Sequence, residues 1–526
     1  MALDELLPKA VKLYPHKEAF VCGDTRLSYQ AFSHRVWQLC RALTGLGLKK
    51  QDRLAILHEN CHVFLETYFA CAHLGLILVP LNIRLSPKEL GMILQDSQSG
   101  TLIAQAKFRD KVEHVASMIP DLIKIIWNQR DFKIVKSKSL DYEVLLQEQG
   151  SAPPPELEIN DADVAQLYYT SGTTGRPKGV MLTHKNVKTH ALGTIAELHL
   201  TDSDNWIHVA PLFHLADAWA TFAITWAGGK HIIVPSFDPL MVFAAMAEEK
   251  VTITNLIPTM LNMMINHPDV KNYDYSSLRV LLSGGAPIAP DLVRKIIETF
   301  DCDYIQTYGM TETSPYLTLS ILKARLKDLP WEEQLKFKAS TGREFIAVSL
   351  KVVDEAGREV PQDGRHTGEI IVKGDIVTPG YWNLPEETER AIQGGWLYTG
   401  DLAVIDEEGY VTIVDRKKDI ILTGGENVYS TEVENVLYMH PDILEAAVIA
   451  VPDSHWGEAV KACVVLKEGC QRMEEEIIAF CKQHLAHYKA PKSVDFLDAL
   501  PLTGTGKIYK KALRDSYWQD KNKRVS

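Results

Sequence analysis

The sequence has 526 residues, of which 46% are hydrophobic and 24% charged, and its formal net charge is −12. A chain of this length and composition is expected to form two or more globular domains. The acidic balance argues against a nucleic-acid-binding surface and against electrostatic binding to an anionic membrane.

The cysteines and the chain ends predict a cytoplasmic protein. Eight cysteines are scattered without CxxC spacing, which predicts reduced, buried thiols and gives little support for a zinc site. The N-terminus carries acids and lacks the basic start and apolar core of a signal peptide. Apolar runs such as 74–81 are too short to span a bilayer, and the final Arg-Val-Ser is not a peroxisomal address. We therefore expect no integral membrane segment.

The first predicted elements alternate between helix and strand. Apolar residues recur at helical spacing around Phe32 and Leu43, and short apolar stretches follow. This alternation predicts a parallel sheet with helices on both faces. The predicted elements of this region are helices at 32–43 and 61–74 and strands at 53–57 and 76–80.

Further along the chain, three turns follow predicted strands. Beyond the Pro-rich connection 151–156, a strand at 164–169 precedes a glycine-rich loop. Ligands of open parallel sheets bind beyond the carboxyl ends of the strands, so we expect all three turns at one edge. The other two units are a strand at 279–282, a turn at 283–287 and a helix at 290–300, then a strand at 303–307 and the turn Tyr308-Gly-Met-Thr-Glu312.

The pattern changes near Asp415. Strands are predicted at 446–451 and 459–466, and a helix at 473–485. Thr431-x-x-Glu434 matches a capping box that would open another helix. These elements predict a small α+β domain of roughly a hundred residues.

The loop between Tyr168 and Gly179 has the composition of a phosphate-binding loop. Glycines let backbone N–H groups turn toward a ligand, hydroxyls add donors, and Lys178 adds a positive charge. The loop lacks the GxxxxGK[ST] pattern of a P-loop, which disfavours a P-loop kinase or ATPase. Its candidate phosphate-binding residues are Thr170, Ser171, Gly172, Thr173, Thr174, Gly175 and Lys178.

Taken with the later motifs, this loop resembles the acyl-adenylate-forming superfamily of acyl-CoA synthetases, peptide-synthetase adenylation domains and luciferases. The resemblance extends from about Leu27 to Arg514 and is strongest to fatty acyl-CoA synthetases. It implies an α/β fold: a large N-terminal domain, 1–417, of parallel-sheet layers plus a β-barrel, and a small mobile α+β domain, 418–526. It also implies two half-reactions. A carboxylate attacks ATP to give acyl-AMP and pyrophosphate, and the thiol of coenzyme A then displaces AMP.

The resemblance assigns roles around ATP. Glu312, with Thr170, would hold Mg²⁺, a hard cation that prefers oxygen ligands. Thr311 would donate to the reacting phosphate or carboxylate, Tyr308 would face adenine, and Asp401 would accept hydrogen bonds from the ribose hydroxyls. The implied ATP-binding residues beyond the phosphate loop are Gly284, Gly285, Ala286, Pro287, Thr307, Tyr308, Gly309, Met310, Asp401 and Arg416.

Further roles fall in the C-terminal part. Lys418 stands at the family's hinge position. Gly424, Gly425 and Glu426 resemble the loop that lines the pantetheine tunnel for coenzyme A. Lys507, in Leu502-Thr-Gly-Thr-Gly-Lys507, would enter the site and neutralise charge that develops during adenylation.

The implied acyl site is the least regular part of the resemblance. Its candidates are His214, Trp219, Gly285 and Gly309. Many relatives place a glycine soon after this histidine, whereas this sequence has Leu215-Ala-Asp-Ala-Trp219. The length and shape of the acyl pocket therefore stay open, and Trp219 is alternatively a core residue.

We therefore predict an ATP- and Mg²⁺-dependent ligase that joins an aliphatic, medium- or long-chain acid to coenzyme A. Its partners would be the acid, ATP and coenzyme A, with no nucleic acid, and a homodimer is left open. A cyclic or aromatic acid is the rival substrate, and a carrier-protein thiol is the rival acceptor; the lack of a carrier domain after Ser526 disfavours the latter. A non-catalytic binding relative is disfavoured by Lys178, Glu312, Asp401 and Lys507, and a serine hydrolase by the absence of GxSxG.

Overall fold

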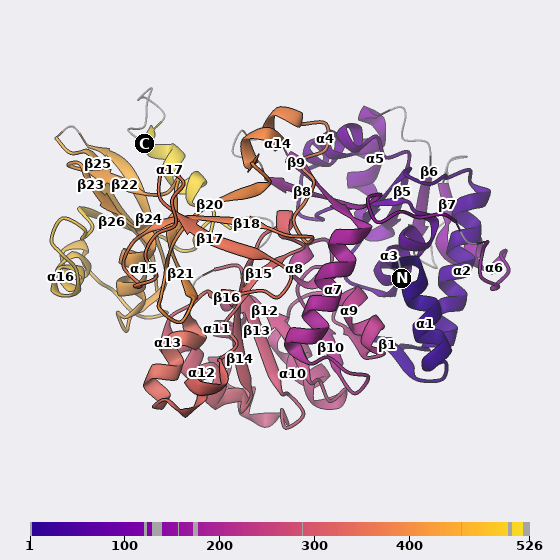
Figure 1. Ribbon diagram of the computed structural model, residues 1–526, viewed down its shortest axis with the longest axis horizontal. Coiled ribbons are helices and arrows are strands. Elements are labelled where there is room, and N and C mark those ends of the chain that lie inside the picture. The colour runs from indigo at the N-terminus through magenta and orange to yellow at the C-terminus, as the bar shows by residue number, and fades with distance from the viewer. Residues whose placement is uncertain are drawn as a thin grey trace.

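The structure, a computed structural model, describes most of the chain (Figure 1). In Figure 1 the chain runs from an N-terminal α/β part on the right, through a central sheet, to a C-terminal part on the left. The described residues are 3–119, 124–128, 139–155, 157–171, 177–286, 288–453, 455–502 and 508–518; within them the Ser171 side chain is not described.

The first sheet is built from the N-terminal third of the chain. Among the described residues it has seven strands in the order β7-β6-β5-β3-β4-β8-β9. Neighbours are parallel except β8 and β9, which are antiparallel. The strands are β3 (Arg53–Leu57), β4 (Ile77–Pro80), β5 (Thr101–Gln105), β6 (Lys124–Asn128), β7 (Ser139–Asp141), β8 (Val164–Ser171) and β9 (Pro177–Thr183).

The second sheet is larger and mixed. Its main path, over the described residues, is β17-β18-β20-β21-β16-β15-β14-β13-β12-β10-β11-β1-β2, and β19 pairs with β20. Along this path, neighbouring strands between β14 and β1 are parallel. The strands numbered β15 to β21 in chain order pair antiparallel with their neighbours. The strands are β1 (Glu18–Cys22), β2 (Thr25–Ser28), β10 (Asn205–His208), β11 (Lys230–Ile233), β12 (Ile253–Leu256), β13 (Val280–Gly284), β14 (Asp303–Gly309), β15 (Tyr316–Leu319), β16 (Gly342–Glu344), β17 (Ser349–Val353), β18 (Gly368–Lys373), β19 (Ile392–Gln393), β20 (Trp396–Ile405) and β21 (Tyr410–Arg416).

Amphipathic helices cover these two sheets. In α2 the side chain of Ser28 accepts a hydrogen bond from Ala31 N–H at the first turn, and Phe32, Val36 and Leu43 turn one face into the core. The helices of this part are α1 (Leu6–Leu13), α2 (Tyr29–Gly45), α3 (His62–Leu74), α4 (Pro87–Ser97), α5 (Arg109–Met118), α6 (Tyr142–Gln147), α7 (His184–Leu198), α8 (Leu215–Ala218), α9 (Ala220–Ala227), α10 (Pro239–Glu248), α11 (Pro258–Ile265), α12 (Pro290–Phe300), α13 (Trp331–Ala339) and α14 (Pro385–Ala391).

The C-terminal part has its own sheet and its own apolar core. Strands pair in the order β23-β22-β25-β24, with β26 alongside β25. The core packs the sheet against α15 and α16 through residues such as Val433, Val448 and Ile477. The elements are β22 (Ile421–Thr423), β23 (Glu426–Val428), α15 (Ser430–Tyr438), β24 (Ile443–Asp453), β25 (Gly457–Leu466), α16 (Glu474–His484), β26 (Ser493–Phe496) and α17 (Lys510–Trp518).

The predicted α/β class, with large parallel and mixed sheets and a separate C-terminal domain, is confirmed. The strand at 53–57 and the helix at 290–300 have the predicted bounds. All eight cysteines are free and six are buried, as their scatter predicted. We assign the expected β-barrel to the antiparallel strands that are numbered β15 to β21 in chain order.

Two predictions about local arrangement are wrong. The three ligand turns do not end strands of one sheet: β8 belongs to the first sheet, whereas β13 and β14 belong to the second. The capping box at Thr431 and Glu434 does not form, because Thr431 donates to the Val414 carbonyl and Glu434 accepts from Val448 N–H at 2.7 Å. Asp415, on β21, instead accepts the Ser430 N–H at 2.5 Å at the start of α15.

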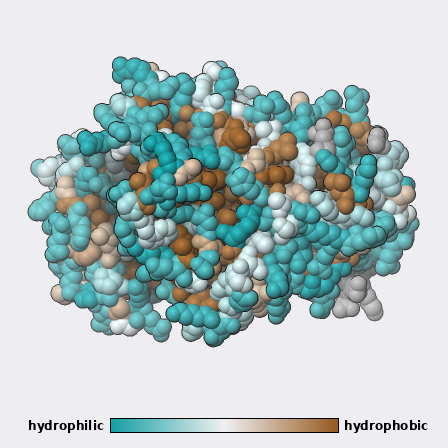
Figure 2. All heavy atoms as spheres, turned by 60° about the horizontal axis from the view of Figure 1, so that its bottom comes forward, coloured by the Kyte–Doolittle hydropathy of each residue, from teal (hydrophilic) through white to brown (hydrophobic). Residues whose placement is uncertain are grey.

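In the described part of the chain, no helix is both long and apolar enough to cross a membrane. Figure 2 shows a face covered mostly by hydrophilic side chains, with hydrophobic ones exposed in separate groups between them.

Candidate active site

Two glycines fix the backbone at the ends of β13 and β14. The strands are parallel neighbours in which Gly284 pairs with Thr307. A Cβ on Gly284 would lie 2.2 Å from Thr307 Oγ1, and a Cβ on Gly309 would lie 1.8 Å from the Pro315 carbonyl oxygen. A side chain at Gly284 would therefore push β13 away from β14, and one at Gly309 would open the turn between β14 and β15.

The turn after β14 brings Tyr308 to a buried carboxylate. The Tyr308 hydroxyl donates to Asp401 Oδ2 at 2.7 Å, and burial, with Asp401 beside it, raises the pKa of this tyrosine. Arg416 Nε lies 3.2 Å from Asp401 Oδ1, because Asp401 and Arg416 are paired across β20 and β21. The structure thus brings together three residues that the sequence predicted for the nucleoside end of ATP.

Glu312 lies at the other end of the same turn. Its side chain is buried, and burial raises the pKa of its carboxyl group. The Tyr381 hydroxyl donates to Glu312 Oε1 at 3.0 Å. Thr311 and Glu312 share the short 3₁₀ turn Thr311–Thr313. Tyr381 was not among the sequence-predicted residues, because it lies outside every motif that the sequence analysis singled out.

Tyr381 also connects Glu312 with the phosphate loop. The ammonium of Lys178, on β9, lies 5.3 Å from the centre of the Tyr381 ring. Lys178 Nζ lies 2.5 Å from Glu387 Oε2, and this contact lowers the pKa of Glu387. Thr170 pairs with Lys178 across β8 and β9. Gly172, Thr173, Thr174 and Gly175 lie outside the described residues.

Residues 374–382, here called the bridging segment, hold the two sheets together at this site. Its Trp382 N–H donates to the Gly179 carbonyl at 2.7 Å, and Gly380 accepts from Met181 N–H at 3.1 Å. Its Thr378 N–H donates to the Glu312 carbonyl at 2.8 Å. Strand β9 and the Glu312 turn are therefore joined by backbone hydrogen bonds to a third segment, not by a shared sheet edge.

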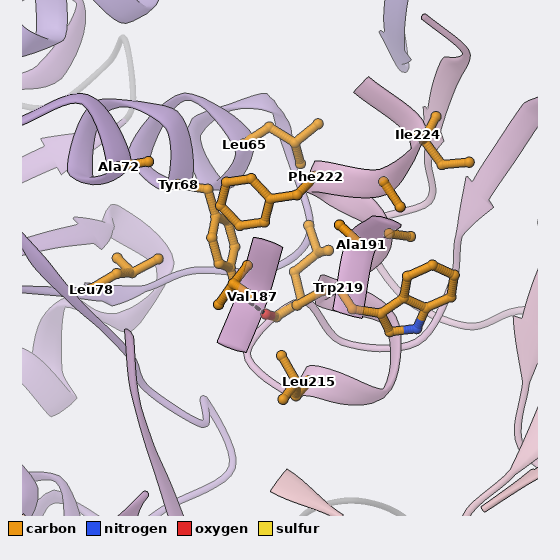
Figure 3. Close-up of a cluster of buried hydrophobic side chains, with 14 of the residues drawn as sticks. Leu65, Tyr68, Ala72, Leu78, Val187, Ala191, Leu215, Trp219, Phe222 and Ile224 are labelled. Carbon is orange, nitrogen blue, oxygen red and sulfur yellow. Dashed lines mark hydrogen bonds between the residues drawn. The ribbon is translucent and has the colours of Figure 1, made fainter. Parts of the chain in front are cut away.

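The acyl-site candidates occupy one turn beside this region. His214 precedes α8, and its ring centre lies 4.6 Å from that of Phe213. Trp219 follows α8 and is 2% exposed; its ring centre lies 5.1 Å from that of Tyr316. Figure 3 shows Leu215 and Trp219 on this turn, near Tyr68 and Phe222. Such burial is what the core alternative for Trp219 predicts, and its role in an acyl pocket stays a prediction.

The coenzyme A candidates form a tight hairpin turn. Gly424 and Gly425, with φ of +60° and +86°, join β22 to β23, which matches a two-residue turn with positive φ at both positions. A Cβ on Gly424 would lie 2.6 Å from the Trp456 ring. The hairpin turn and the nearby Trp456 ring therefore explain these two glycines structurally, independently of any role in binding a ligand. Glu426, the last of the coenzyme A candidates, is exposed, and so is the hinge candidate Lys418.

The remaining candidates lie in the turn after β13 and near the C-terminus. Gly285 has a φ of +91°, and the Ala286 carbonyl accepts a hydrogen bond from the Gln306 side-chain amide. Pro287 and Lys507 lie outside the described residues.

In the part of the chain that the structure describes, no three histidine, cysteine or acidic side chains are grouped as metal ligands. Glu312 is a buried carboxylate whose Oε1 accepts a hydrogen bond from the Tyr381 hydroxyl. One such carboxylate suits Mg²⁺, which usually keeps waters and substrate phosphates among its ligands.

Comparison with known proteins covers both parts of the chain. A sequence model of the AMP-binding enzyme matches residues 7–382, and one of the AMP-binding enzyme C-terminal domain matches residues 432–507. A feruloyl-CoA synthase of Amycolatopsis is 38% identical over 96% of this chain and 97% of its own. A long-chain-fatty-acid–CoA ligase of Mycobacterium tuberculosis is 33% identical over 97% of this chain and 98% of its own. The ATP-bound crystal structure of MatB from Rhodopseudomonas palustris superposes with a TM-score of 0.87, at 30% identity and 99% coverage of both chains.

The contact between Lys178 and Glu387 generates a prediction. A phosphate that binds Lys178 must displace Glu387, so Glu387→Gln should lower the KM for ATP, by at most about fivefold because the pair is partly solvated. Steady-state kinetics with varied MgATP measure this. Glu386→Gln is the matched control, since Glu386 lies on the same helix and its carboxylate is 3.7 Å from Arg390, whereas Lys178 pairs with Glu387. An equal shift in both variants would mean that general charge, not Lys178, is responsible.

Proposed function

The chain belongs to the AMP-binding enzyme family, and from this premise we propose that it is an ATP- and Mg²⁺-dependent carboxylate–CoA ligase working through acyl-AMP. The observation that carries the proposal is the meeting of two groups at one turn. Tyr308, Asp401 and Arg416 gather at one end, and Glu312 and Tyr381, with Lys178 beside them, at the other.

The predicted family and enzyme class are confirmed. Both family domains match in order, and the similar proteins carry the names of CoA ligases and synthetases. The predicted use of ATP, Mg²⁺ and coenzyme A agrees with this membership and with an ATP-bound structural neighbour. The chain is therefore an acid–thiol ligase, while the acid it uses is a separate question.

In the proposed mechanism, the large domain binds ATP between its two sheets. Asp401 accepts hydrogen bonds from the ribose, Tyr308 lies against adenine, and Arg416 contacts ribose or phosphate. Thr170 and Lys178, with the rest of the phosphate loop, hold the β- and γ-phosphates. The segment Gly284-Gly-Ala-Pro287 would let backbone approach the adenine edge and the acyl group. Thr307, Gly309 and Met310 complete the proposed ATP-binding residues.

Glu312, with Thr170, would hold Mg²⁺, which supplies positive charge to the phosphate oxygens when bound. The burial that raises the pKa of Glu312 makes its carboxylate costly without a cation, and this suits a site that binds one. Thr311, beside it, would donate to the reacting phosphate or carboxylate.

The C-terminal domain, proposed as 418–526 against 1–417, would serve both half-reactions by rotating at Lys418. Lys507 would neutralise charge during adenylation. Gly424, Gly425 and Glu426 would line the path of coenzyme A during thioester formation.

The proposed substrate is an aliphatic, medium- or long-chain acid, with an aromatic acid as the second candidate. The fatty-acid ligase relative supports the first. The feruloyl-CoA synthase, at 38% identity, and the aromatic rings packed around Trp219 favour the second. His214, Trp219, Gly285 and Gly309 are the proposed acyl-site residues. A cytoplasmic location and a homodimer remain hypotheses from the sequence alone.

A substrate panel tests the function. We expect AMP and pyrophosphate release with ATP, and a CoA thioester only when coenzyme A is added. The panel should contain straight-chain acids of increasing length and hydroxycinnamic acids such as ferulate, with products identified by mass spectrometry. ADP as product, or no thioester from any acid, would contradict the proposal. Acyl transfer to a carrier protein but not to coenzyme A would favour the rival acceptor.

Lys507→Ala should separate the half-reactions. Removal of a charge aimed at developing phosphate charge commonly costs ~10²–10³ in rate, so acyl-AMP formation should fall by that factor. Transfer from supplied acyl-AMP to coenzyme A should be preserved. Single-turnover assays of each step measure this, with Lys511→Ala as the charge-matched control. Normal adenylation together with lost thioester formation would reverse the assignment.

Trp219→Ala should both destabilise the protein and change its acid preference. Loss of a buried indole costs about 3–5 kcal/mol of unfolding free energy. If the ring ends the acyl pocket, kcat/KM should also shift gradually toward longer or bulkier acids, at about 1–3 kcal/mol per methylene. Phe300→Ala, in a different apolar cluster, is the control that should lower Tm alone. An unchanged acid profile would assign Trp219 to the core only.

A further inference from the structure

We propose that Asp217 is a positioning residue for the acyl-acid site, because its buried carboxylate fixes the helix α8 that carries His214 and Trp219 at its two ends. The inference rests on the proposed function, since it concerns the acid that this ligase activates. Asp217 lies in the stretch Leu215-Ala-Asp-Ala-Trp219, where the sequence departs from the pattern of many relatives.

The carboxylate of Asp217 is docked onto strand β10. Its side chain is fully buried, and each oxygen has one partner. Trp206 Nε1 donates to Oδ1 at 2.9 Å, and His208 Nδ1 lies 3.0 Å from Oδ2. Trp206 and His208 are two residues apart in β10, so their side chains point to the same face of the sheet, toward α8.

A second layer of hydrogen bonds holds His208 in place. His208 Nε2 lies 2.9 Å from His231 Nδ1 on β11, and His231 Nε2 lies 2.9 Å from Thr225 Oγ1 on α9. Burial, and His208 beside it, hold the pKa of His231 well below its ordinary value, so this ring is neutral. Each ring nitrogen of His208 and His231 therefore has a hydrogen-bond partner, and this chain of hydrogen bonds ends at the Thr225 hydroxyl.

The backbone of α8 is held from a second strand. The Asn255 side-chain amide, on β12, donates to the Ala216 carbonyl at 2.6 Å. Trp219 Nε1 donates to the same carbonyl at 3.0 Å. The helix is thus tied to β10 through Asp217 and to β12 through Ala216.

These ties matter because α8 spans only Leu215–Ala218. A helix of one turn has no stability of its own, so the contacts with the sheet set its position. The Ala218 N–H donates to the His214 carbonyl at 3.3 Å, which couples His214 to the same turn. Loss of the Asp217 contacts would remove the tie between this turn and β10, and displacements of about 1 Å near reacting groups cost up to 10²-fold in rate.

The Asp217 contacts predict different effects for two substitutions. Asp217→Ala leaves Trp206 Nε1 and His208 without their buried partner. Asp217→Asn keeps a side-chain oxygen that can accept from Trp206 Nε1. Its NH₂ group can donate to His208 Nδ1 if both His208 and His231 change tautomer, so that His208 donates to His231 and His231 donates to the Thr225 hydroxyl. The asparagine variant should therefore retain most of the positioning.

The experiment measures KM for the acid and for ATP separately, using the acid that the unmodified protein converts fastest. In Asp217→Ala we expect the acid KM to rise about tenfold or more while the ATP KM changes less than about twofold. Asp217→Asn should restore the acid KM to within about threefold. Melting curves run beside both variants.

The matched control is Asp204→Asn. Asp204 is also buried, at the other end of β10, and accepts from Arg279 Nε and Thr252 Oγ1, each at 2.8 Å. It should lower Tm without changing the ratio of the two KM values. An unchanged ratio of the acid KM to the ATP KM in Asp217→Ala, with only a lowered Tm, would overturn the inference. If the alanine variant does not fold, Trp206→Phe takes its place, since it removes the donor to Asp217 Oδ1 and keeps an aromatic ring, and an unchanged ratio in that variant overturns the inference in the same way. Absence of acid-dependent pyrophosphate release by the unmodified protein would overturn the proposed function, and the inference with it.

Discussion

The backbone hydrogen bonds of the bridging segment, 374–382, are the constraint on which the candidate site depends. Thr378 N–H holds the Glu312 carbonyl and Trp382 N–H holds the Gly179 carbonyl, so one short stretch joins the turn after β14 to strand β9. These strands belong to different sheets. The segment thus joins β9 to the turn that carries the candidate metal ligand, although no strand pairing among the described residues connects their two sheets. Tyr381 lies within the segment and contacts both sides.

Three buried carboxylates of the large domain differ in how their charge is satisfied. Asp217 has a donor on each oxygen and belongs to a closed network. Asp401 faces Tyr308 and Arg416, both of which the family resemblance places beside the nucleotide. Glu312 accepts from Tyr381 on one oxygen, and burial raises the pKa of its carboxyl group. The closed network around Asp217 is suited to holding the structure in place, whereas Asp401 and Glu312 are suited to binding ligands.

The C-terminal domain is attached by more than its connecting chain. Asp415, at the end of β21, accepts from both the N–H and the hydroxyl of Ser430, and burial raises its pKa. Lys510, on α17, donates to the Ser430 hydroxyl and pairs with Glu434, each at 2.7 Å. A rotation at Lys418 would have to break the Asp415–Ser430 contact or carry Asp415 along. This contact therefore belongs to the energetics of any domain movement.

The sequence by itself determined the elements and motifs whose cause is local. The strand at 53–57 and the helix at 290–300 follow from apolar spacing, and Gly284 and Gly309 mark turns that tolerate no side chain. It also indicated the family, because the motif residues keep their order along the chain. Only the tertiary structure decided that β8 and β14 lie in separate sheets, that Tyr381 joins Glu312 to Lys178, and that Asp217 faces Trp206 and His208. The physical reason is that strand partners and buried polar contacts join residues far apart in sequence or on different elements, whereas spacing and turn chemistry report only the nearest neighbours.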